Sequence, residues 1–559
     1  MSESEENSLA RWEFRRGLRS WFHSKLCKWW AQVFVRDATG LVKELGLRDH
    51  FLISQGIVIL INGFIPTALF APYFFPGANL YIVFALGAVP AICMAYVYGK
   101  LSAGMPRSGG DYVWSARVVG PLYATIQMVF IVTGLLFYSV INLWFMFDVA
   151  LGPSVFGIGA ATQSTALTQL GTNLASVAWG YPLSFVVLVA IILIALLGIR
   201  VYSLFCRITV PLYFVICAAF TVGVLLIPTA AFPAVFDKAM SFAGYANETY
   251  SAVLSQSTAS GISATSFSMS NTLLAAIPWG FFTYIGFNWS SYSAGETKKV
   301  KTSIFDAYFL SVILTVIVLE IMTLIYYNTF TTGFVNSLAY VAGVNPSAFP
   351  VLPYGNFLLA LYNPPLGAIV CFGLFLGWMI NSIGLIIFAS RMLFAGAMDR
   401  ILPTRLADVS DRFHCPHVAT IVMGVLSAIY LTIYWEFGAI STFLNSSVAV
   451  PAALALPLLA AFLFPIIKPG LYNRLYGSMK GAVAMSLTGL IGAAAFAFYV
   501  FSETSPLVSG TFLGASLDIA YEFVLALGIV AVMIYLLGRQ RMKAAGVDPR
   551  AVFSEIPPE

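Results

Sequence analysis

The sequence predicts an all-α protein that crosses a membrane about twelve times. Composition is the first reason, because 59% of the residues are hydrophobic and only 9% are charged, against about 25% charged in a typical soluble protein. The mean hydropathy is +0.87. Such a chain has too few polar residues to cover a surface that faces water. The second reason is the regular return of apolar stretches of about 20 residues, the length that crosses a hydrocarbon core.

These apolar stretches follow one another with short polar connections. Residues that interrupt helices make the first, sixth and tenth spans candidates for discontinuous helices. The predicted spans are Phe51–Tyr73, Leu80–Ala103, Val118–Asp148, Trp179–Leu197, Leu204–Ile227, Thr272–Ala294, Ile304–Thr329, Leu366–Ala389, Val418–Phe437, Ile440–Ile467, Val483–Phe501 and Ala515–Leu537.

The positive residues give the predicted orientation. If the N-terminus is inside the cell, alternating spans place every Lys and Arg on the cytoplasmic side except Lys238. The outer connections Gly152–Ala178 and Thr331–Pro365 contain no charged residue. Cytoplasmic loops of membrane proteins are enriched in Lys and Arg, so we predict a multi-pass protein of the plasma membrane with both termini in the cytoplasm. The net charge of +5 then suits an anionic inner leaflet rather than nucleic acid.

The sixth span carries the clearest functional signal. Between Pro278 and Lys298 it contains glycines, an amide, hydroxyls and aromatic rings where a simple span would carry Leu and Val. Non-helical backbone at membrane depth survives only where protein buries it or where it lines a wet cavity. The first span also has breakers, at Gly63, Pro66 and Pro72. Paired interruptions in two halves of a chain are a pointer to the binding site of a secondary transporter.

Other functional classes fit the sequence less well. A channel would need rings of charges or carbonyls, usually in a symmetric oligomer. An intramembrane hydrolase would need a nucleophile and a base, yet all 4 His residues lie outside the predicted spans. The sequence has no phosphate-binding loop and no Cys or His spacing typical of a metal site. We therefore expect no enzyme, no metal and no organic cofactor, and the oligomeric state stays unpredicted.

Several short motifs stand at the ends of the predicted spans, and together they cover most of residues 45–410. They are Leu45-Gly46-Leu47, Pro106-Arg107-Ser108-Gly109-Gly110-Asp111-Tyr112, Ser390-Arg391 and Asp399-Arg400-Ile401-Leu402-Pro403. The broken sixth span adds Gly286-Phe287 and Gly295-Glu296. In this combination the chain resembles a prokaryotic-type amino acid permease of the amino acid–polyamine–organocation (APC) superfamily.

The resemblance implies a leucine-transporter-like fold, with two inverted repeats of five spans and discontinuous helices one and six. The implied function is secondary active transport of amino acids or related small amines by alternating access. A non-transporting substrate sensor, and an exchanger or channel-like carrier of another small organic solute, remain alternatives. The expected organisation is a basic and aromatic cytoplasmic segment (1–48), the first repeat (49–228), an outer loop (229–271), the second repeat (272–467), two peripheral spans (468–538) and a cytoplasmic tail (539–559).

We expect a small zwitterionic or cationic solute between the breaks of spans one and six. Aromatic rings there suit either a hydrophobic side chain or an amine held by cation–π attraction. The first span departs from the family, whose amino-acid-binding members have a glycine-rich turn with bare amides, because Pro66 has no amide for a carboxylate. The predicted contacts are Asn62, Gly63, Thr67, Phe282, Gly286, Phe287 and Asn288.

Candidates for coupling to an ion gradient lie in three other spans. Glu320 is the carboxyl deepest inside a predicted span, and such residues are costly enough to be functional candidates. Tyr213 aligns near the position where some proton-coupled relatives have a lysine. Asn381 and Ser382 could form a sodium site with carbonyls of the span-one break, or simply bond neighbouring helices. A coupling proton, Na⁺ and uncoupled exchange stay open, with the proton favoured over sodium because of Glu320.

Two features are expected at the inner surface. Arg391, near the inner end of span eight, is interpreted as a residue that extends to the membrane interface. The loop around Gly109 and Gly110 is interpreted as a hinge beside an inner gate.

Overall fold

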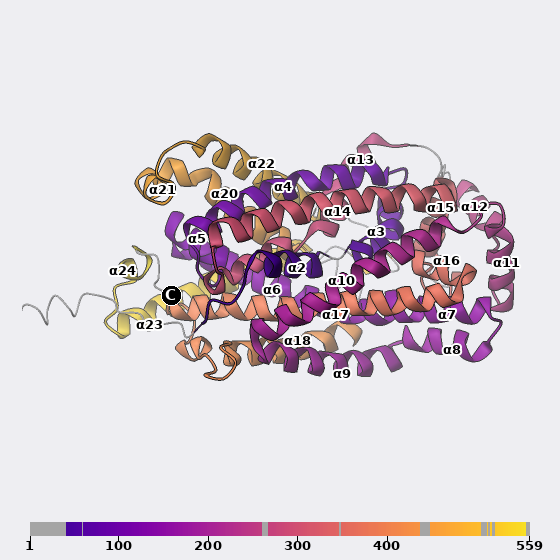
Figure 1. Cartoon of the computed structure of the whole chain (residues 1–559), viewed down its shortest axis with the longest axis horizontal. Helices are drawn as coiled ribbons and strands as arrows, with labels where there is room; N and C mark the ends of the chain where they lie inside the picture. The colour runs from indigo at the N-terminus through magenta and orange to yellow at the C-terminus, as the bar shows by residue number, and fades with distance from the viewer. Residues whose placement is uncertain are drawn as a thin grey trace, which may run out of the picture.

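The structure is a computed structural model that describes residues 41–58, 60–259, 267–345, 348–436, 448–504, 511–512, 515–516 and 520–554. These residues form a bundle of helices (Figure 1). Eleven of the described helical stretches are long and apolar enough to cross a membrane. The prediction of an all-α polytopic membrane protein is therefore confirmed. Most of the predicted N-terminal segment, residues 1–40, lies outside the described residues.

The elements have the following bounds. The first part of the chain forms α2 (Leu47–Ile57), α3 (Leu60–Phe74), α4 (Leu80–Gly104), α5 (Gly110–Val118), α6 (Pro121–Phe145), η1 (Met146–Leu151), α7 (Gly152–Ala161), α8 (Thr165–Leu174), α9 (Val177–Leu196), α10 (Gly198–Leu225), α11 (Phe232–Phe242) and α12 (Tyr250–Ala259). The middle forms α13 (Met269–Ala275), η2 (Ala276–Gly280), η3 (Phe281–Tyr284), η4 (Phe287–Tyr292), η5 (Ala294–Glu296), α14 (Val300–Phe330), α15 (Thr332–Val344) and α16 (Gly355–Tyr362). The last part forms α17 (Pro364–Met398), η7 (Thr404–Ala407), α18 (His417–Glu436), α20 (Ala449–Ile467), α21 (Pro469–Tyr476), α22 (Ala482–Thr504), β1 (Thr511–Phe512), β2 (Ala515–Ser516), α23 (Ala520–Ala544) and α24 (Pro549–Ser554).

The predicted spans correspond to these helices, but several bounds differ: α17 runs to Met398 rather than Ala389, and α10 begins at Gly198 rather than Leu204. The sixth is not one helix but the series α13 to η5, and the first is divided into α2 and α3. The third continues through a π-helical turn to Ala161. The twelfth begins at Ala520 rather than Ala515 and runs on to Ala544, because Ala515 pairs with Phe512 in a short hairpin. The expected start of the tenth span, residues 440–447, lies outside the described residues.

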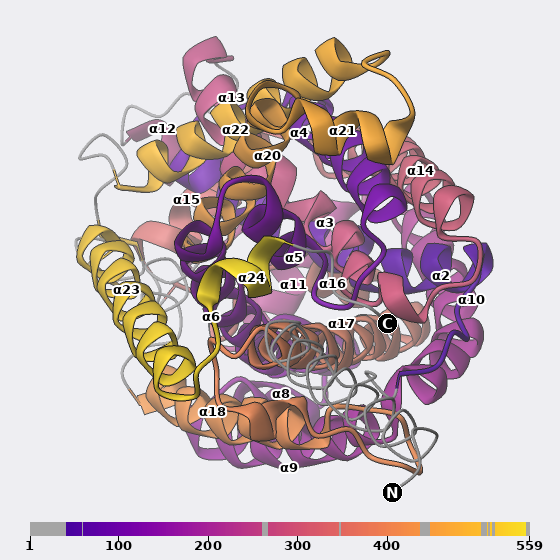
Figure 2. The same cartoon turned by 90° about the vertical axis from the view of Figure 1, so that its left-hand side faces the viewer.

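The bundle is apolar on its outside as well as in its core. In the first span 88% of the most apolar window is buried, whereas in α23 only 11% is. Outer helices carry large exposed apolar side chains, such as Val186 on α9, Ile208 on α10 and Val483 on α22. Figure 2 looks along the bundle and shows α9, α18 and α23 at its rim. A surface of this kind needs lipid around it, as the composition predicts.

The two ends of the bundle are built differently (Figure 1). The short helices α11, α12, α15 and α16 gather at one end, and α5, α21 and α24 gather at the other. The first group belongs to connections predicted to lie outside the cell, and the second to connections predicted to lie inside. The fold therefore separates the two sets of loops as the charge pattern requires.

The long helix α17 is central to the site that follows. Asn363 caps the N-terminus of this helix, because its side chain accepts a hydrogen bond from the Leu366 amide. Pro364 occupies the first helical position, where a missing amide hydrogen is tolerated. It packs against α6 on one side and α10 on the other. Asn381, Ser382 and Arg391 are thereby held along one continuous helix, each of them buried.

Candidate functional site

The first interruption lies between α2 and α3. Helix α2 ends at Ile57, and Val58 is extended, with ψ 106°. The last carbonyl of α2 has its hydrogen-bond donor on α17, because the Asn381 side-chain amide donates to the Ile57 carbonyl at 2.6 Å. Asn142 of α6 in turn donates to the Asn381 side-chain oxygen at 2.8 Å. Two neutral amides thus hold the end of α2 in place.

A backbone amide near the start of α3 has its hydrogen-bond acceptor on α10. The backbone amide of Asn62, which has no acceptor inside the helix so near its start, donates to the Tyr213 hydroxyl at 3.4 Å. That hydroxyl donates to the Asn62 side-chain oxygen at 2.8 Å, and the Asn62 side-chain nitrogen donates to the Leu374 carbonyl at 2.7 Å. The structure therefore brings together Asn62 and Tyr213, which were predicted for two different roles.

The second interruption lies in the sixth span. A π-helical turn at Ala276–Gly280 leads into a 3-10 turn at Phe281–Tyr284, and a second 3-10 turn follows at Phe287–Tyr292. Gly286 joins the two with φ 102°, a conformation that residues with a side chain rarely adopt. A Cβ added to Gly286 would overlap the Ile57 side chain. The two interruptions therefore touch, and they can do so only because residue 286 is glycine.

Three other predicted contacts lie on α3 and η3. A Cβ added to Gly63 would lie 3.1 Å from the Thr283 side chain, so the helices are close here. Phe282 packs with its ring 6.2 Å from that of Tyr138. Thr67 is completely buried, and its hydroxyl has no hydrogen-bond partner among the described residues. An unsatisfied buried hydroxyl is uncommon in a native structure.

Phe287 and Asn288 lie beyond the Gly286 turn and face α2 and α14. The Phe287 carbonyl accepts from the Ser54 hydroxyl at 2.8 Å, and its ring lies 5.4 Å from that of Tyr308. The Tyr308 hydroxyl donates to the Asn288 carbonyl at 2.9 Å. Phe287 and Asn288 therefore contact α2 and α14, whereas Gly63 contacts η3 and Phe282 contacts α6.

The remaining coupling candidates, Ser382 and Glu320, interact with elements other than the break of the first span. The Ser382 hydroxyl donates to the Ser139 carbonyl at 3.3 Å, toward α6. Glu320 is half-buried on α14, where its charge acts on the hydroxyls of Tyr81 and Tyr284. It thus lies on the side of α4 and η3, while Asn381 contacts the break of the first span.

The position of the first break differs from the sequence-based expectation. We expected it around Gly63 and Pro66, but both lie within α3 and the break is at Val58. Gly63 allows close approach to η3 instead of a turn. Pro66 is tolerated inside α3, where it leaves the Asn62 carbonyl without its usual helical donor. The break is placed by partners on α10 and α17 that are distant in sequence.

The chain matches a known protein family over most of its length. The profile of the family described as amino acid permease matches residues 45–534, which run from just before α2 into α23 and include both interruptions. The chain belongs to the amino acid permease family. It is thus a permease of the APC superfamily, and the family is one of multi-pass membrane transporters rather than enzymes. A comparison with curated proteins finds no match.

The permease also has a buried ion pair that the sequence did not lead us to expect. Arg391 of α17 binds Glu296 of η5 through two hydrogen bonds, of 2.6 and 3.0 Å. The two side chains are 1% and 2% exposed. The interpretation of Arg391 as a residue that extends to the membrane interface is therefore wrong. Both residues belong to the family motifs, and this membership was the sequence signal that could have marked the pair as important.

Further polar contacts close the same end of the permease. Arg117 of α5 binds Asp399 through hydrogen bonds of 2.6 and 3.0 Å. Asp111 accepts hydrogen bonds from the hydroxyls of Tyr98 at 2.7 Å and Tyr292 at 2.8 Å. Burial raises the pKa of Asp111 to about 7, although both tyrosines act to lower it. These contacts connect α4, α5 and α17 to η4 and η5, the part of the sixth span that follows Gly286.

Proposed function

We propose that this permease carries a small amino acid or a related amine across the plasma membrane by alternating access. The observation that carries the proposal is the contact between the two interruptions, where Gly286 meets Ile57. Discontinuous helices present backbone amides and carbonyls to the charged groups of a solute. Membership of the amino acid permease family supports an amino acid or a near relative as that solute.

The proposed site lies between α3 and η3. Gly63, Thr67, Phe282 and Gly286 line it, and Asn62, Phe287 and Asn288 shape its two ends. The unsatisfied Thr67 hydroxyl supports a polar contact with the solute, and the Phe282 ring supports an apolar or cationic one. All of these residues are buried, so a solute reaches them only after one end of the bundle opens. That requirement favours a carrier over a channel.

Coupling to a proton is proposed ahead of coupling to Na⁺. A sodium site would use oxygens at the first break, but one lone pair of the Ile57 carbonyl already accepts a hydrogen bond from Asn381, and the Tyr213 hydroxyl is hydrogen-bonded to Asn62 on the opposite side of the break. Glu320 keeps one buried carboxylate oxygen without a hydrogen-bond partner among the described residues, which supports it as the proton acceptor. Exchange without an ion is the alternative.

The function is tested with purified protein in proteoliposomes. Counterflow of a radiolabelled solute, with the twenty amino acids and polyamines as competitors, identifies the solute. Only a carrier exchanges solute, so the absence of counterflow for every solute that binds would favour a substrate sensor. Uptake with a proton gradient or a sodium gradient imposed alone then identifies the coupling ion. If Glu320→Gln leaves the pH dependence of uptake unaltered, Glu320 has a structural role only.

A further inference from the structure

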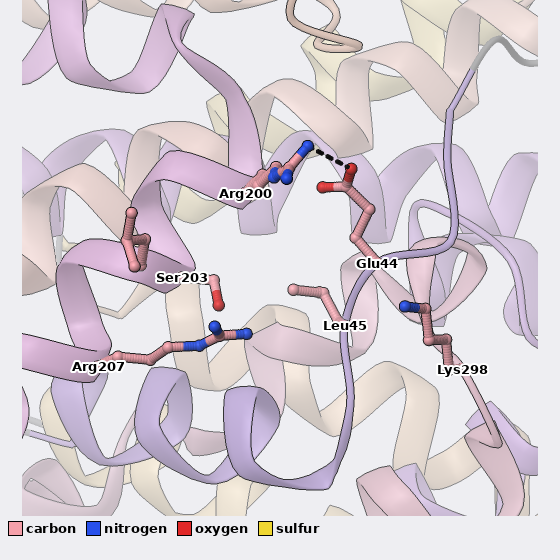
Figure 3. A pocket seen from close by; sticks show the side chains of 7 residues that line it. Glu44, Leu45, Arg200, Ser203, Arg207 and Lys298 are labelled. Carbon is pink, nitrogen blue, oxygen red and sulfur yellow. Dashed lines mark hydrogen bonds and ion pairs between the residues drawn. The ribbon is translucent and has the colours of Figure 1, made fainter.

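A cavity lies away from the two interruptions, beside the start of α2. Its volume is about 340 Å³. Three of its side chains are cationic, and they come from two segments: Arg200 and Arg207 from α10, and Lys298 from the connection before α14. Figure 3 shows these groups around one space. The lining residues are Glu44, Leu45, Arg200, Ser203, Leu204, Arg207 and Lys298.

The positive charge in this cavity is only partly neutralised. Arg200 pairs with Glu44 at 3.5 Å, but its side chain is 81% exposed, and such pairs are weak. Arg207 uses its Nε to bind Asp49 at 2.8 Å. Its two terminal nitrogens have no acceptor among the described residues, and neither has the Lys298 amine. Three cations thus stand against two carboxylates, with donors left over for an anion.

The same face of α10 continues into an apolar stripe. Arg200, Leu204 and Arg207 are spaced by four and three residues, which places them on one side of the helix. Leu204, Ile208, Leu212 and Val215 follow along the helix, with exposed fractions of 43–68%. Leu204 both lines the cavity and faces outward. The cavity therefore opens toward the bilayer as well as toward water, which a site for a soluble anion would not require.

We propose that this cavity binds an anionic phospholipid of the inner leaflet. The phosphate contacts Arg200, Arg207 and Lys298, and an acyl chain lies along the stripe from Leu204 to Val215. Basic pockets of membrane helices on the cytoplasmic side are suited to such headgroups.

Binding there would hold the closed end of the permease together. The amides of Glu44 and Leu45 donate to the Glu296 carbonyl at 2.9 and 3.0 Å, and the Lys298 amide donates to the Leu45 carbonyl at 2.8 Å. A phosphate between α10 and Lys298 therefore fastens the start of α2 and the end of the sixth span to α10. These segments separate if this end opens, so the lipid favours the closed arrangement.

The experiment is a binding titration of the full-length protein in a neutral detergent, with phosphatidylglycerol or phosphatidylcholine added and lipid adducts counted by native mass spectrometry. Phosphatidylglycerol is expected to bind in preference to phosphatidylcholine. Arg200→Gln and Lys298→Gln are each expected to weaken its apparent affinity about fivefold, since one basic group near a membrane surface contributes about 1 kcal/mol. Arg405→Gln, which removes an exposed charge of η7, is expected to leave the affinity unchanged.

Three results would overturn the proposal. Equal binding of the two lipids would show that charge is not recognised, and an equal loss in Arg405→Gln would show that the effect is not local. Full competition by soluble glycerol phosphate at the concentration of the lipid would identify a site for a soluble anion instead. The readout is binding, so it does not depend on whether any solute is transported.

Discussion

Asn381 of α17 donates a 2.6 Å hydrogen bond to the carbonyl of Ile57, the last residue of α2. A carbonyl at the end of a buried helix needs a partner, and here the partner comes from a helix more than three hundred residues later. The Asn142 amide orients Asn381 from the other side. The end of α2 is therefore positioned by a neutral chain of amides.

Removing this amide should destabilise the protein. Asn381→Ala leaves the Ile57 carbonyl and the Asn142 amide buried without partners, and we expect a loss of about 1–3 kcal/mol in the free energy of unfolding. Chemical denaturation in detergent measures it. Ser382→Ala is the control, because its 3.3 Å hydrogen bond to Ser139 is long, and a loss below about 1 kcal/mol is expected. Equal losses in the two variants would contradict a special role for Asn381.

Substituting Gly286 should stop transport. Gly286→Leu places a side chain where Ile57 lies and forces φ 102° on a residue with a Cβ, so we expect uptake to be abolished with expression near normal. Gly286→Ala tests the same contact with a smaller group. The control is Gly477→Ala, which has φ 73° but open space around it, and loses only roughly 1–2 kcal/mol through strain. Normal uptake kinetics in Gly286→Ala would move the site elsewhere.

The two kinds of ion pair should respond very differently to neutralisation. Glu296→Gln leaves the Arg391 guanidinium buried without a counter-charge, and the expected loss of stability is about 3–5 kcal/mol. Glu44→Gln breaks the exposed pair with Arg200, where about 0–1 kcal/mol is expected. Unfolding in detergent, followed for both variants under one condition, checks the difference. Similar losses would mean that the buried Arg391 guanidinium, which also donates to the Ile387 carbonyl at 3.2 Å, does not depend on the charge of Glu296.

Stability should fall as the pH rises, through Asp111. Burial raises the pKa of Asp111 to about 7 from its ordinary 3.8, so the folded protein holds this proton more tightly than the unfolded chain. The stabilisation is complete below about pH 4 and is lost as the pH rises through about 7. Asp111→Asn removes this dependence. The difference in thermal midpoint between variant and parent should therefore move in favour of the variant from pH 4 to pH 8, and a constant difference would show that Asp111 is ionised throughout.

Orientation can be tested by labelling with an impermeant maleimide. A cysteine at the exposed Asn247, in the loop between α11 and α12, should react in intact cells. A cysteine at Arg405 should react only after permeabilisation. Native Cys415 is a poor reporter of sidedness because it is buried. The reverse pattern would invert the predicted topology.

The sequence predicts the membrane spans well and the site only in outline. Apolar runs of the right length identify the helices because the bilayer fixes that length. Gly286 is recognisable as a breaker because glycine adopts positive φ far more readily than residues with a side chain. Val58 is not recognisable, since a β-branched residue says nothing of a break, and its extended conformation depends on Asn381 and Tyr213 from distant helices. Local sequence carries no record of such partners.

The buried charges show the same limit. Arg391, considered alone, resembles the many arginines that extend to a membrane surface. Only the fold shows that Glu296 reaches the same point, 95 residues away in the sequence. Asn142 was overlooked for a similar reason: an amide in an apolar stretch signals some hydrogen bond between helices, but not which one.

The two arginine–carboxylate pairs at the closed end, Arg117 with Asp399 and Arg391 with Glu296, have side chains no more than 2% exposed. Dissolved ions weaken attraction between charges that water can surround, over a distance of about 8 Å at physiological salt. A dissolved ion cannot reach these buried partners until the helices at this end have moved apart. The strength of this closure is therefore insensitive to the salt concentration of the water around it. In the predicted orientation, a cell that accumulates potassium during osmotic stress does not loosen it.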